Sequence, residues 1–245
     1  MASGFFSMLL RALRDEQAEY LAVAFDPHGP TFRHAQYADY KAGRPPTPED
    51  LRVQFPILRE ILQAMGVPIL SVDGYEADDM LGTVSRRVSE AGDVCVLVTG
   101  DRDAFQLAGE RVSILYTRRG ATDVVRVTPE YIQETYGVSP ERLSDIKGLM
   151  GDASDNLPGI PGIGEKTAIR LISRYGTLEN ALAEGARQEK GKLQERLIQG
   201  RENAEMSKHL ATIARDAPVE FDMDSCRADT MPGGLEALQK YKLFK

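Results

Sequence analysis

Apolar and polar residues alternate along the first half of the chain in a way that predicts strands and helices in turn. The segment YLAVAFD (20–26) is an apolar run without helical period, which is typical of a buried strand. VCVLVTG (94–100) has the same character. Further strands are predicted at 67–72, 112–116 and 123–127, and helices at 4–15, 47–65 and 76–91. Strands alternating with helices indicate an α/β fold whose mostly parallel central sheet is flanked by helices.

The pattern changes after about residue 128. Helices joined by short Gly/Pro loops are predicted at 129–136, 140–150, 165–175, 178–184, 190–199 and 202–214. We therefore expect an α/β core over residues 1–135, a helical subdomain over 136–216 and an irregular tail over 217–245.

The composition is that of an ordinary soluble globular protein, with 42% hydrophobic and 27% charged residues among 245. No apolar run approaches the length of a membrane span, so no membrane partner is expected. The two cysteines, Cys95 and Cys226, lie far apart and show no disulfide or zinc pattern. A reducing, cytoplasmic compartment is expected from this cysteine usage.

Acidic side chains follow three successive predicted strands and recur at the junction GDASDN between the two halves. These residues are Asp26, Glu76, Asp78, Asp79, Asp101, Asp103, Asp152 and Asp155. Taken singly, each is explained equally well as a helix-capping or turn residue. Ligands of open parallel sheets, however, bind beyond the carboxyl ends of the strands. Independent capping needs would not bring carboxylates to one edge three times in succession.

Eight carboxylates at one edge would repel each other strongly unless cations lay between them. Oxygen ligands without histidine or cysteine favour Mg²⁺, with Mn²⁺ as the alternative, over zinc. More carboxylates than one ion needs predict two ions about 3.5–4 Å apart, as in phosphodiester hydrolysis. The net charge of −7 argues against a nucleic-acid partner, but without these eight acids 29 acidic residues face 30 basic ones. A phosphate ligand is therefore compatible with the sequence.

The stretch 27–47 has no apolar periodicity and mixes basic with aromatic residues, among them Arg33, Tyr40, Lys41 and Arg44. Such a mixture suits a phosphate backbone with unstacked bases, although a solvated surface helix would look similar. Because the stretch follows Asp26 directly, we expect it to overhang the acidic edge.

LPGIPGIGEKTAIRLISRYG (157–176) predicts a tight turn that opens a helix. Gly162 and Gly164 form the turn, and Lys166 and Thr167 begin the helix. Glycines in this position expose backbone N–H groups at a helix N-terminus, which is a natural phosphate site. The arrangement resembles the helix-hairpin-helix element that grips duplex DNA without reading its sequence.

Several segments, in their order along the chain, resemble the 5′ nuclease family, which includes the 5′–3′ exonuclease domain of bacterial DNA polymerase I and the flap endonucleases. These segments are AVAFDP, TFRH, YKAGR, GYEADD, TGDRD and GDASDNLPGIPGIGEKTA. The similarity extends over about residues 5–215. It implies a PIN-like nuclease core, a helical arch at about 27–50 and a helix-hairpin-helix at about 145–176.

The resemblance also implies an activity: a structure-specific 5′–3′ exonuclease and flap endonuclease of DNA replication and repair. It implies two divalent ions, a potassium ion at the hairpin carbonyls and a substrate DNA with 5′ flaps, nicks or free 5′ ends. A bacterial, nucleoid-associated monomer is expected, beside a polymerase domain in the native gene.

The resemblance assigns roles to individual residues. Asp26, Glu76, Asp78 and Asp79 would serve the first metal region, and Asp101, Asp103, Asp152 and Asp155 would complete the cluster. Lys41 and Arg44 would contact the scissile phosphate and act with Asp101 in catalysis, while Tyr40 would stack on a terminal base. The DNA-binding set further includes Arg33, Gly162, Gly164, Lys166 and Thr167.

One departure from the family pattern concerns the N-terminus. Members begin with a central strand ending in an Asp-Gly metal motif and a following arginine, whereas residues 4–26 resemble the segment after that strand. We expect the chain to lack one strand, one metal ligand and one basic residue. A catalytically impaired, structure-specific DNA-binding module is therefore an alternative function. A phosphatase of small phosphoesters is a weaker alternative, because it would not need the hairpin.

Overall fold

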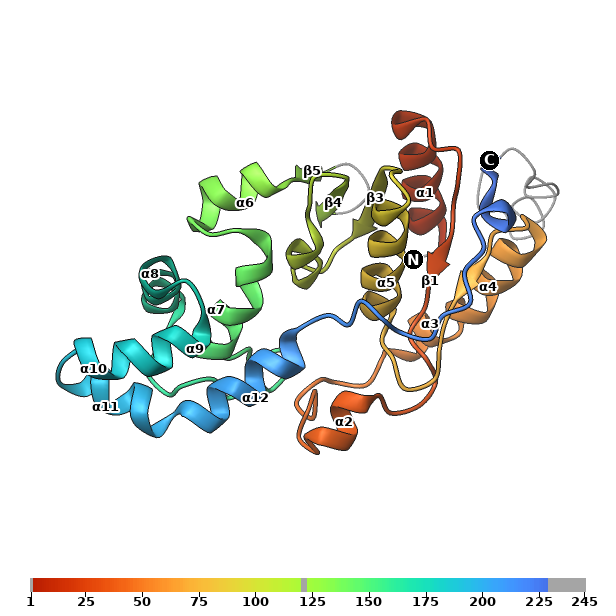
Figure 1. The fold of residues 1–245 in the computed structure, drawn as a ribbon. Helices are drawn as coiled ribbons and strands as arrows, with labels where there is room; N and C mark the ends of the chain where they lie inside the picture. Colours follow the sequence, from red (N-terminus) through yellow and green to blue (C-terminus); the bar gives the residue numbers. More distant parts are fainter. Residues whose placement is uncertain (1, 120–122, 229–245) are drawn as a thin grey trace.

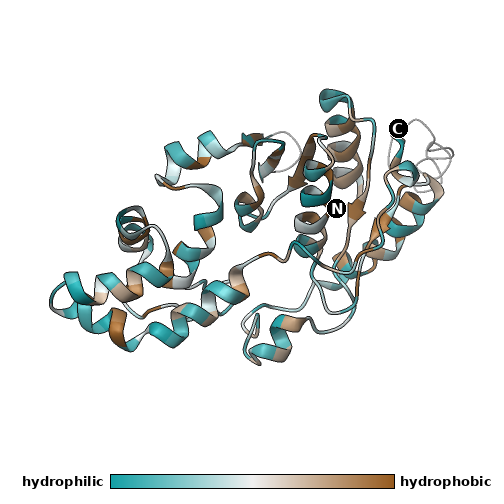
Figure 2. Cartoon of the chain, viewed as in Figure 1, coloured by the Kyte–Doolittle hydropathy of each residue, from teal (hydrophilic) through white to brown (hydrophobic). Residues whose placement is uncertain are grey.

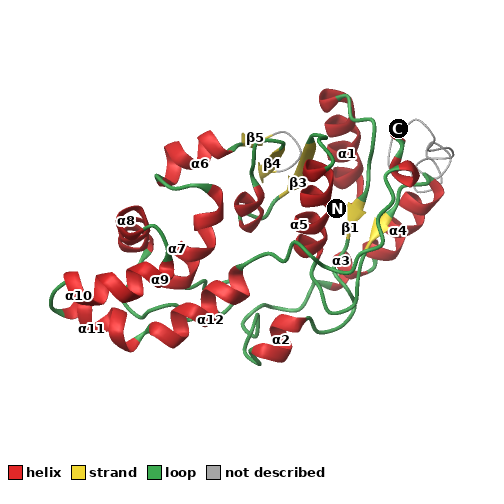
Figure 3. Ribbon diagram, viewed as in Figure 1, coloured by secondary structure: helices red, strands yellow, loops and turns green. Residues whose placement is uncertain are grey.

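Among the described residues, five strands lie in the first half of the chain, with helices around them (Figures 1 and 3). The computed structural model describes residues 2–119 and 123–228. Strand β1 (Val23–Ala24) pairs in parallel with β2 (Ile69–Leu70). Strand β3 (Cys95–Thr99) pairs in parallel with β4 (Val112–Arg119), which pairs antiparallel with β5 (Asp123–Val127). Over the described residues these strands form two separate sheets, and the first two predicted strands shorten to two residues each.

Helices cover the strands because their apolar faces need burial. The helices of this half are α1 (Ala2–Glu16), α2 (Phe32–Gln36), α3 (Glu49–Arg52), α4 (Gln54–Ala64) and α5 (Ala77–Glu90), with the 3₁₀ turn η1 (Asp103–Leu107). Phe6 of α1 packs with Ile61 and Leu62 of α4 in one fully buried cluster. Figure 2 shows apolar residues concentrated on β1 and β3 and on the helix faces toward them. The segment predicted as an arch carries α2, turns, and the start of α3.

The second half is helical, as predicted. Its elements are α6 (Pro129–Tyr136), η2 (Pro140–Arg142), α7 (Leu143–Met150), α8 (Glu165–Tyr175), α9 (Leu178–Asn180), η3 (Ala181–Gly185), α10 (Ala186–Gln188), α11 (Lys192–Gln199) and α12 (Arg201–Ala211). Thr128 caps α6 with its side chain, and Gly137 ends that helix in the left-handed conformation. Leu149, Leu171 and Leu178 belong to a core of their own in this half. In the described chain no helix is both long and apolar enough to cross a membrane.

The end of the described chain returns to the first half (Figure 1). Ala217 is fully buried in a cluster with Leu70 and Met80, and η4 (Asp224–Cys226) follows. The backbones of Arg227 and Tyr20 form an isolated antiparallel β-bridge. Residues 217–228 of the predicted tail therefore belong to the packed core, and 229–245 lie outside the described residues.

Helices α7 and α12 approach each other closely at Gly148. A Cβ atom on Gly148 would lie 2.8 Å from Lys208 Cβ and 3.0 Å from the carbonyl oxygen of Ala204. Both distances are tighter than ordinary van der Waals contact, so the crossing depends on a glycine. This crossing matters for the site below, because the chain leaves α7 directly into the segment that holds Asp152 and Asp155.

We predict that Gly148→Ala lowers the free energy of unfolding by about 1–3 kcal/mol, because the added methyl group forces α7 away from α12. Gly4→Ala is the matched control: Gly4 lies in α1 with open space around it. Alanine there should instead stabilise the fold by about 0.5–1 kcal/mol. Thermal unfolding of both variants measures the two effects, at about 2–4 °C per kcal/mol. Equal shifts for the two variants would contradict this packing.

Candidate metal centre and nucleic-acid interface

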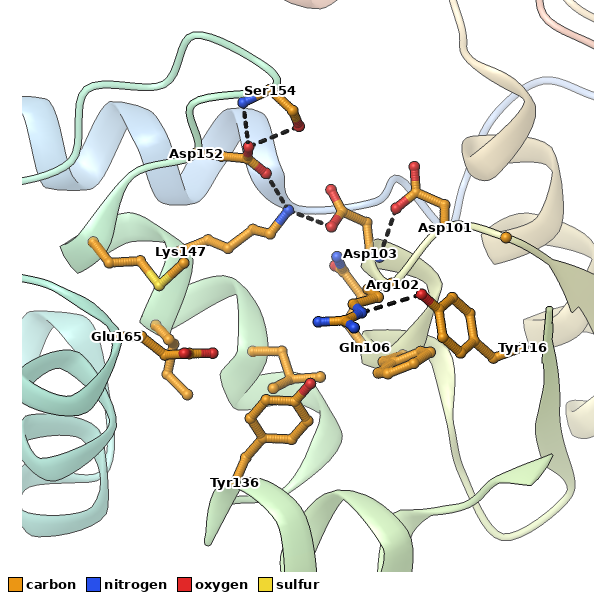
Figure 4. A pocket seen from close by; sticks show the side chains of 15 residues that line it. Asp101, Arg102, Asp103, Gln106, Tyr116, Tyr136, Lys147, Asp152, Ser154 and Glu165 are labelled. Atoms are coloured by element: carbon orange, nitrogen blue, oxygen red, sulfur yellow. Dashed lines mark hydrogen bonds and ion pairs between the residues drawn. The ribbon is translucent and has the colours of Figure 1, made fainter. Parts of the chain in front are cut away.

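Carboxylates from four separate segments line two cavities that share Asp101 and Asp103. The smaller cavity also has Glu76, Asp78 and Asp155 in its wall. The larger cavity has Asp152 in its wall (Figure 4). The local structure explains the arrangement: Asp101 and Asp103 follow β3, and Glu76 and Asp78 begin α5. The structure thus brings together most of the carboxylates that the sequence singled out.

Three of these carboxylates form a group that could hold a cation. One oxygen atom each of Asp103, Asp152 and Asp155 lies within 4.8 Å of the other two. The turn after α7 fixes two of them, because Asp152 and Leu157 exchange backbone hydrogen bonds of 2.8 and 2.9 Å. The Asp152 side chain also accepts from the amide and hydroxyl of Ser154. An all-oxygen donor set of this kind fits Mg²⁺ or Mn²⁺.

Asp78 is a carboxylate whose negative charge is strongly disfavoured by its surroundings. Among the described residues it has no hydrogen-bond or ion-pair partner. Burial, followed by the charges of Asp101, Asp103 and Asp26, raises the pKa of Asp78 to about 7. A half-buried carboxyl near other carboxyls, without a partner of its own, suits the coordination of a divalent cation. The residues therefore fit a metal centre.

Asp26 lies at the edge of this cluster and also serves the backbone. Its Oδ1 accepts a 2.8 Å hydrogen bond from the amide of Ala77, the first residue of α5. Asp26 therefore accepts a hydrogen bond at the start of α5 and also lies close enough to Asp78 for its charge to raise the pKa of Asp78.

Asp79 and Arg33 occupy positions other than those expected of a metal ligand and a DNA contact. Their side chains form a buried two-pronged ion pair with both distances 2.8 Å. Asp79 also accepts from the amides of Glu76 and Ala214. Its oxygens are thus used by the protein itself, because residue 79 is rotated about 100° around α5 from residue 78. Arg33 additionally donates to the carbonyl of Leu210 and ties three segments together.

The segment after α2 folds onto the acidic cluster. Lys41 Nζ lies 2.7 Å from Glu76 Oε1, and Arg44 Nη2 lies 2.5 Å from Asp155 Oδ1. The Tyr40 hydroxyl is 3.2 Å from both of these acids. Tyr40 is only 3% exposed, so its ring does not offer the free stacking surface that the resemblance implied. Burial, reinforced by the two carboxylates, raises its pKa and keeps the hydroxyl protonated.

Lys147 is a site residue that the sequence analysis missed. Its ammonium group bonds both Asp103 and Asp152, the latter at 2.5 Å, from the last turn of α7 (Figure 4). Burial opposes the ionisation of Asp152, but the hydrogen bonds from Lys147 outweigh it and lower the pKa of Asp152 to about 2. The available signal was a lysine one helical turn before the end of a helix that leads into GDASDN.

The glycine hairpin joins α7 to α8 as predicted. Gly162 has φ +82° and its carbonyl accepts from Arg196. Gly164 is the N-cap of α8, and a Cβ there would meet nothing within 4 Å. Within the described residues, the amides of Gly164 and Glu165 have no acceptor. Lys166 and Thr167 follow in the first turn, so this turn presents N–H groups and one ammonium group to solvent.

Comparisons with known proteins agree with this geometry. A family described as the 5'-3' exonuclease N-terminal resolvase-like domain matches residues 1–137, and the 5'-3' exonuclease C-terminal SAM fold matches residues 138–232. DNA polymerase I of Bacillus caldotenax is 48% identical over 221 residues, and that of Thermus filiformis, a thermostable enzyme, is 43% identical over 230. These matches cover 90% and 94% of this chain but only 25% and 27% of the relatives. The chain thus spans about a quarter of their length.

Solved structures show the same fold. T5 5'-exonuclease with bound zinc ions superposes with a TM-score of 0.74 at 22% identity, covering 98% of this chain and 89% of that one. The catalytic core of Rad2 with a DNA substrate gives a TM-score of 0.55 at 16% identity, covering 98% of this chain and 80% of that one. With both parts of the family matched along nearly the whole chain, the protein belongs to the 5'-3' exonuclease family.

Proposed function

We propose that this chain is a structure-specific 5′–3′ exonuclease and flap endonuclease that hydrolyses DNA phosphodiesters at 5′ ends and 5′ flaps. The observation that carries the proposal is the convergence of carboxylates around Asp78, which has no partner in the described chain. Membership in the 5'-3' exonuclease family and a neighbour solved with DNA supply the substrate class. The hairpin before α8 supplies a second place for a phosphate backbone.

Two Mg²⁺ ions, or Mn²⁺ ions, are the proposed cofactors. Asp103, Asp152 and Asp155 would hold one, and Glu76, Asp78 and Asp101 would face the other. Such ions, when bound, neutralise the charge of the phosphate and activate water. A potassium ion at the hairpin carbonyls belongs to the same proposal; Gly162 already gives its carbonyl to Arg196.

The basic side chains of the site have a proposed positioning role. Lys41 and Arg44 neutralise Glu76 and Asp155 at the position where the phosphate would arrive. Cations that take over these carboxylates would release the ammonium and guanidinium groups toward the phosphate oxygens. A guanidinium group binds two phosphate oxygens at once, which orients the phosphate as well as attracting it. Lys147, in the last turn of α7, would hold Asp103 and Asp152 in place.

The hairpin and the acidic centre are proposed to hold different parts of one substrate. The exposed amides of the hairpin carry no sequence information, so they suit the duplex beside the cleavage point. The partners proposed are thus branched, nicked or 5′-ended DNA and, from the length of the relatives, a polymerase domain. A monomer in the bacterial cytoplasm, at the nucleoid, completes the proposal.

The direct test is incubation with a 5′-flap duplex in Mg²⁺ and, separately, in Ca²⁺. Cleavage in Mg²⁺ and binding without cleavage in Ca²⁺ support the nuclease. Binding without cleavage in either ion would replace the proposal with a DNA-binding module. Hydrolysis of a small phosphoester with indifference to DNA would replace it with a phosphatase.

Asp101→Asn should cost far more in cleavage than in binding. Asparagine keeps the oxygen that accepts from the amide of Asp103 at 2.9 Å but removes the charge that faces the ions. We expect a single-turnover rate at least about 100-fold lower, with a duplex Kd in Ca²⁺ changed by less than about twofold. Losses of similar size in both measurements would contradict a metal role for Asp101.

Asp78 should make the metal-free protein less stable as the pH rises. Its pKa of about 7 in the folded state lies above the ordinary value of 3.8, so the folded protein holds the proton more tightly than the unfolded chain. The resulting stabilisation is complete below about pH 4 and is lost as the pH rises through about 7. Asp78→Asn should therefore raise the Tm relative to the unsubstituted protein at pH 8 but little at pH 4, in EDTA.

Added Mg²⁺ serves as the control for this variant. The ion should raise the Tm of the unsubstituted protein more than that of Asp78→Asn, because the variant lacks one of the charged carboxylates that face the ions. A variant with a lower Tm than the unsubstituted protein at pH 8 in EDTA would show that the Asp78 charge stabilises the fold.

Gly164→Val should weaken duplex binding about tenfold by covering the amides at the start of α8. The open space at this position allows the side chain without a clash. Gly109→Val, another glycine with open space around it, is the matched control and should bind the duplex normally. Hydrolysis of a very short substrate should be unchanged in both. If short substrates suffer as much as duplexes, the hairpin is not a separate grip.

A further inference from the structure

A histidine completes the hydrogen-bond pattern that begins α2. In a capping box, the third helical residue is normally Glu or Gln, and its side chain accepts a hydrogen bond from the amide of the N-cap residue. Thr31 is the N-cap of α2, and its amide donates to Nδ1 of His34 at 3.1 Å. An imidazole nitrogen thus takes the place of the usual side-chain oxygen. Neither residue has a role in the function proposed above.

This hydrogen bond fixes the protonation state of the imidazole ring. A backbone amide can only donate, so Nδ1 of His34 carries a lone pair and the neutral ring has its proton on Nε2. The Thr31 hydroxyl also lies 3.0 Å from Nδ1, but a hydroxyl group can donate or accept and does not select a state. Thr31 is only 6% exposed, and its amide has no other acceptor among the described residues. A proton on Nδ1 would therefore leave a buried N–H group without a partner, which is unfavourable.

The start of α2 contacts the loop that leads into α5. Phe32, directly after the cap, donates its amide to the carbonyl of Gly74 at 2.8 Å. Its ring lies 5.6 Å from that of Tyr75, measured between centroids. The His34 ring meets the ring of Tyr40 edge to face, with centroids 5.2 Å apart. The cap thus connects α2 both to the acidic start of α5 and to the segment that follows α2.

That segment needs support, because its backbone is strained. Lys41 has φ +57°, a left-handed conformation that is costly for a residue with a side chain. Its amide donates to the carbonyl of Asp155 at 2.9 Å, and its ammonium lies 4.9 Å from the centre of the Tyr40 ring. The ring of His34 packs against Tyr40, so a displaced α2 would also shift Lys41 away from Glu76.

The charged and titratable groups of the surrounding elements bond partners other than the imidazole. Tyr40 contacts the imidazole through its ring, while its hydroxyl bonds two acids. The remaining pairs are Arg33 with Asp79 of α5, Lys41 with Glu76 of α5, Arg44 with Asp155 after α7, and His209 of α12 with Gln36. Within the described chain, the bond from Thr31 is therefore the one that distinguishes the neutral from the protonated ring of His34.

We propose that His34 is a positioning residue whose neutral imidazole orders the segment from α2 to Arg44 over the acidic centre, and whose protonation loosens that segment. The part of the proposal that concerns cleavage rests on the nuclease function; the cap itself does not. Histidine side chains change charge between about pH 5 and 8. Cleavage should therefore fall as the pH falls, for a reason separate from the carboxylates of the metal centre.

Nuclear magnetic resonance tests the cap without a variant or a substrate. The chain has three histidines, His28, His34 and His209, so their ring signals are easily separated. In ¹⁵N-labelled protein at pH 8 we expect a ¹⁵N–¹⁵N coupling across the hydrogen bond between the Thr31 amide and Nδ1 of His34, with the ring proton on Nε2. A ring proton on Nδ1, or an assigned Thr31 amide without this coupling, would overturn the proposal.

The pH dependence of cleavage tests the positioning role. His34→Gln keeps a side-chain acceptor at this helical position but cannot take up a proton. Its single-turnover rate should lie within about twofold of the unsubstituted rate at pH 8, and the ratio of the two rates should rise at least about threefold by pH 5.5. His34→Ala lacks the acceptor and should cleave about fivefold more slowly at pH 8, the equivalent of one capping interaction.

His28→Gln is the matched control, because His28 is an exposed histidine outside α2. Its rate relative to the unsubstituted protein should not change with pH. Ratios taken at each pH cancel the titration of the carboxylates, which all these proteins share. Equal rates for His34→Gln and His34→Ala at pH 8, or a His34→Gln ratio that is constant with pH, would contradict the positioning role.

Hydrogen exchange of the Lys41 amide separates this role from the nuclease function. At one pH, the amide should exchange at least about threefold faster in His34→Ala than in His34→Gln, with no DNA present. If flap DNA is cleaved but the two variants exchange and cleave alike, the positioning role is wrong and the nuclease stands. If flap DNA is not cleaved but the exchange rates differ as expected, the nuclease fails and His34 still orders the segment.

Discussion

Carboxylates that share a small, partly buried space repel one another unless positive charge lies between them, and the arrangement of this protein follows from that constraint. Six acids gather where the start of α5, the turn after β3 and the turn after α7 meet, and Asp26, after β1, lies beside them. Three basic side chains form ion pairs with these acids: Lys41 and Arg44 from the segment after α2, and Lys147 from α7. Asp78 is left without a partner in the described chain, and burial together with the neighbouring carboxylates raises its pKa.

A buried ion pair, between Arg33 and Asp79, holds together the segments that carry the acidic centre. Arg33 and Asp79 join α2 to α5, and Arg33 also donates to the carbonyls of Leu210 and Thr212 at the C-terminal end of α12. The first turn of α5, which carries Glu76 and Asp78, is thereby fixed to the helical half. Removing one partner of such a buried pair typically costs about 3–5 kcal/mol, so the pair is a structural support whose loss would distort the site. Stability and the proposed chemistry are thus served by neighbouring residues of one acidic motif.

Much of this fold and site could be predicted from the sequence because periodicity and turn chemistry are local. Helices α6 and α8 begin and end where predicted, and the acids at the ends of predicted strands do meet. The direction of individual side chains and the contacts between distant segments could not be predicted. The sequence EADD (76–79) does not show that Asp78 lines the cavity while Asp79 pairs with the buried Arg33. That difference depends on the packing of α5 against residues about 135 positions away. The burial of Tyr40 and the reach of Lys147 depend equally on distant contacts.

The central claim is that these carboxylates exist to hold paired divalent cations. The most direct measurement is anomalous X-ray scattering from crystals of the protein soaked in Mn²⁺. The account predicts two peaks about 3.5–4 Å apart, one within coordinating distance of Asp103, Asp152 and Asp155 and the other beside Asp78. Mn²⁺ bound at other sites in the crystal but no peak among these side chains, with Lys41 and Arg44 still in their ion pairs, would contradict it.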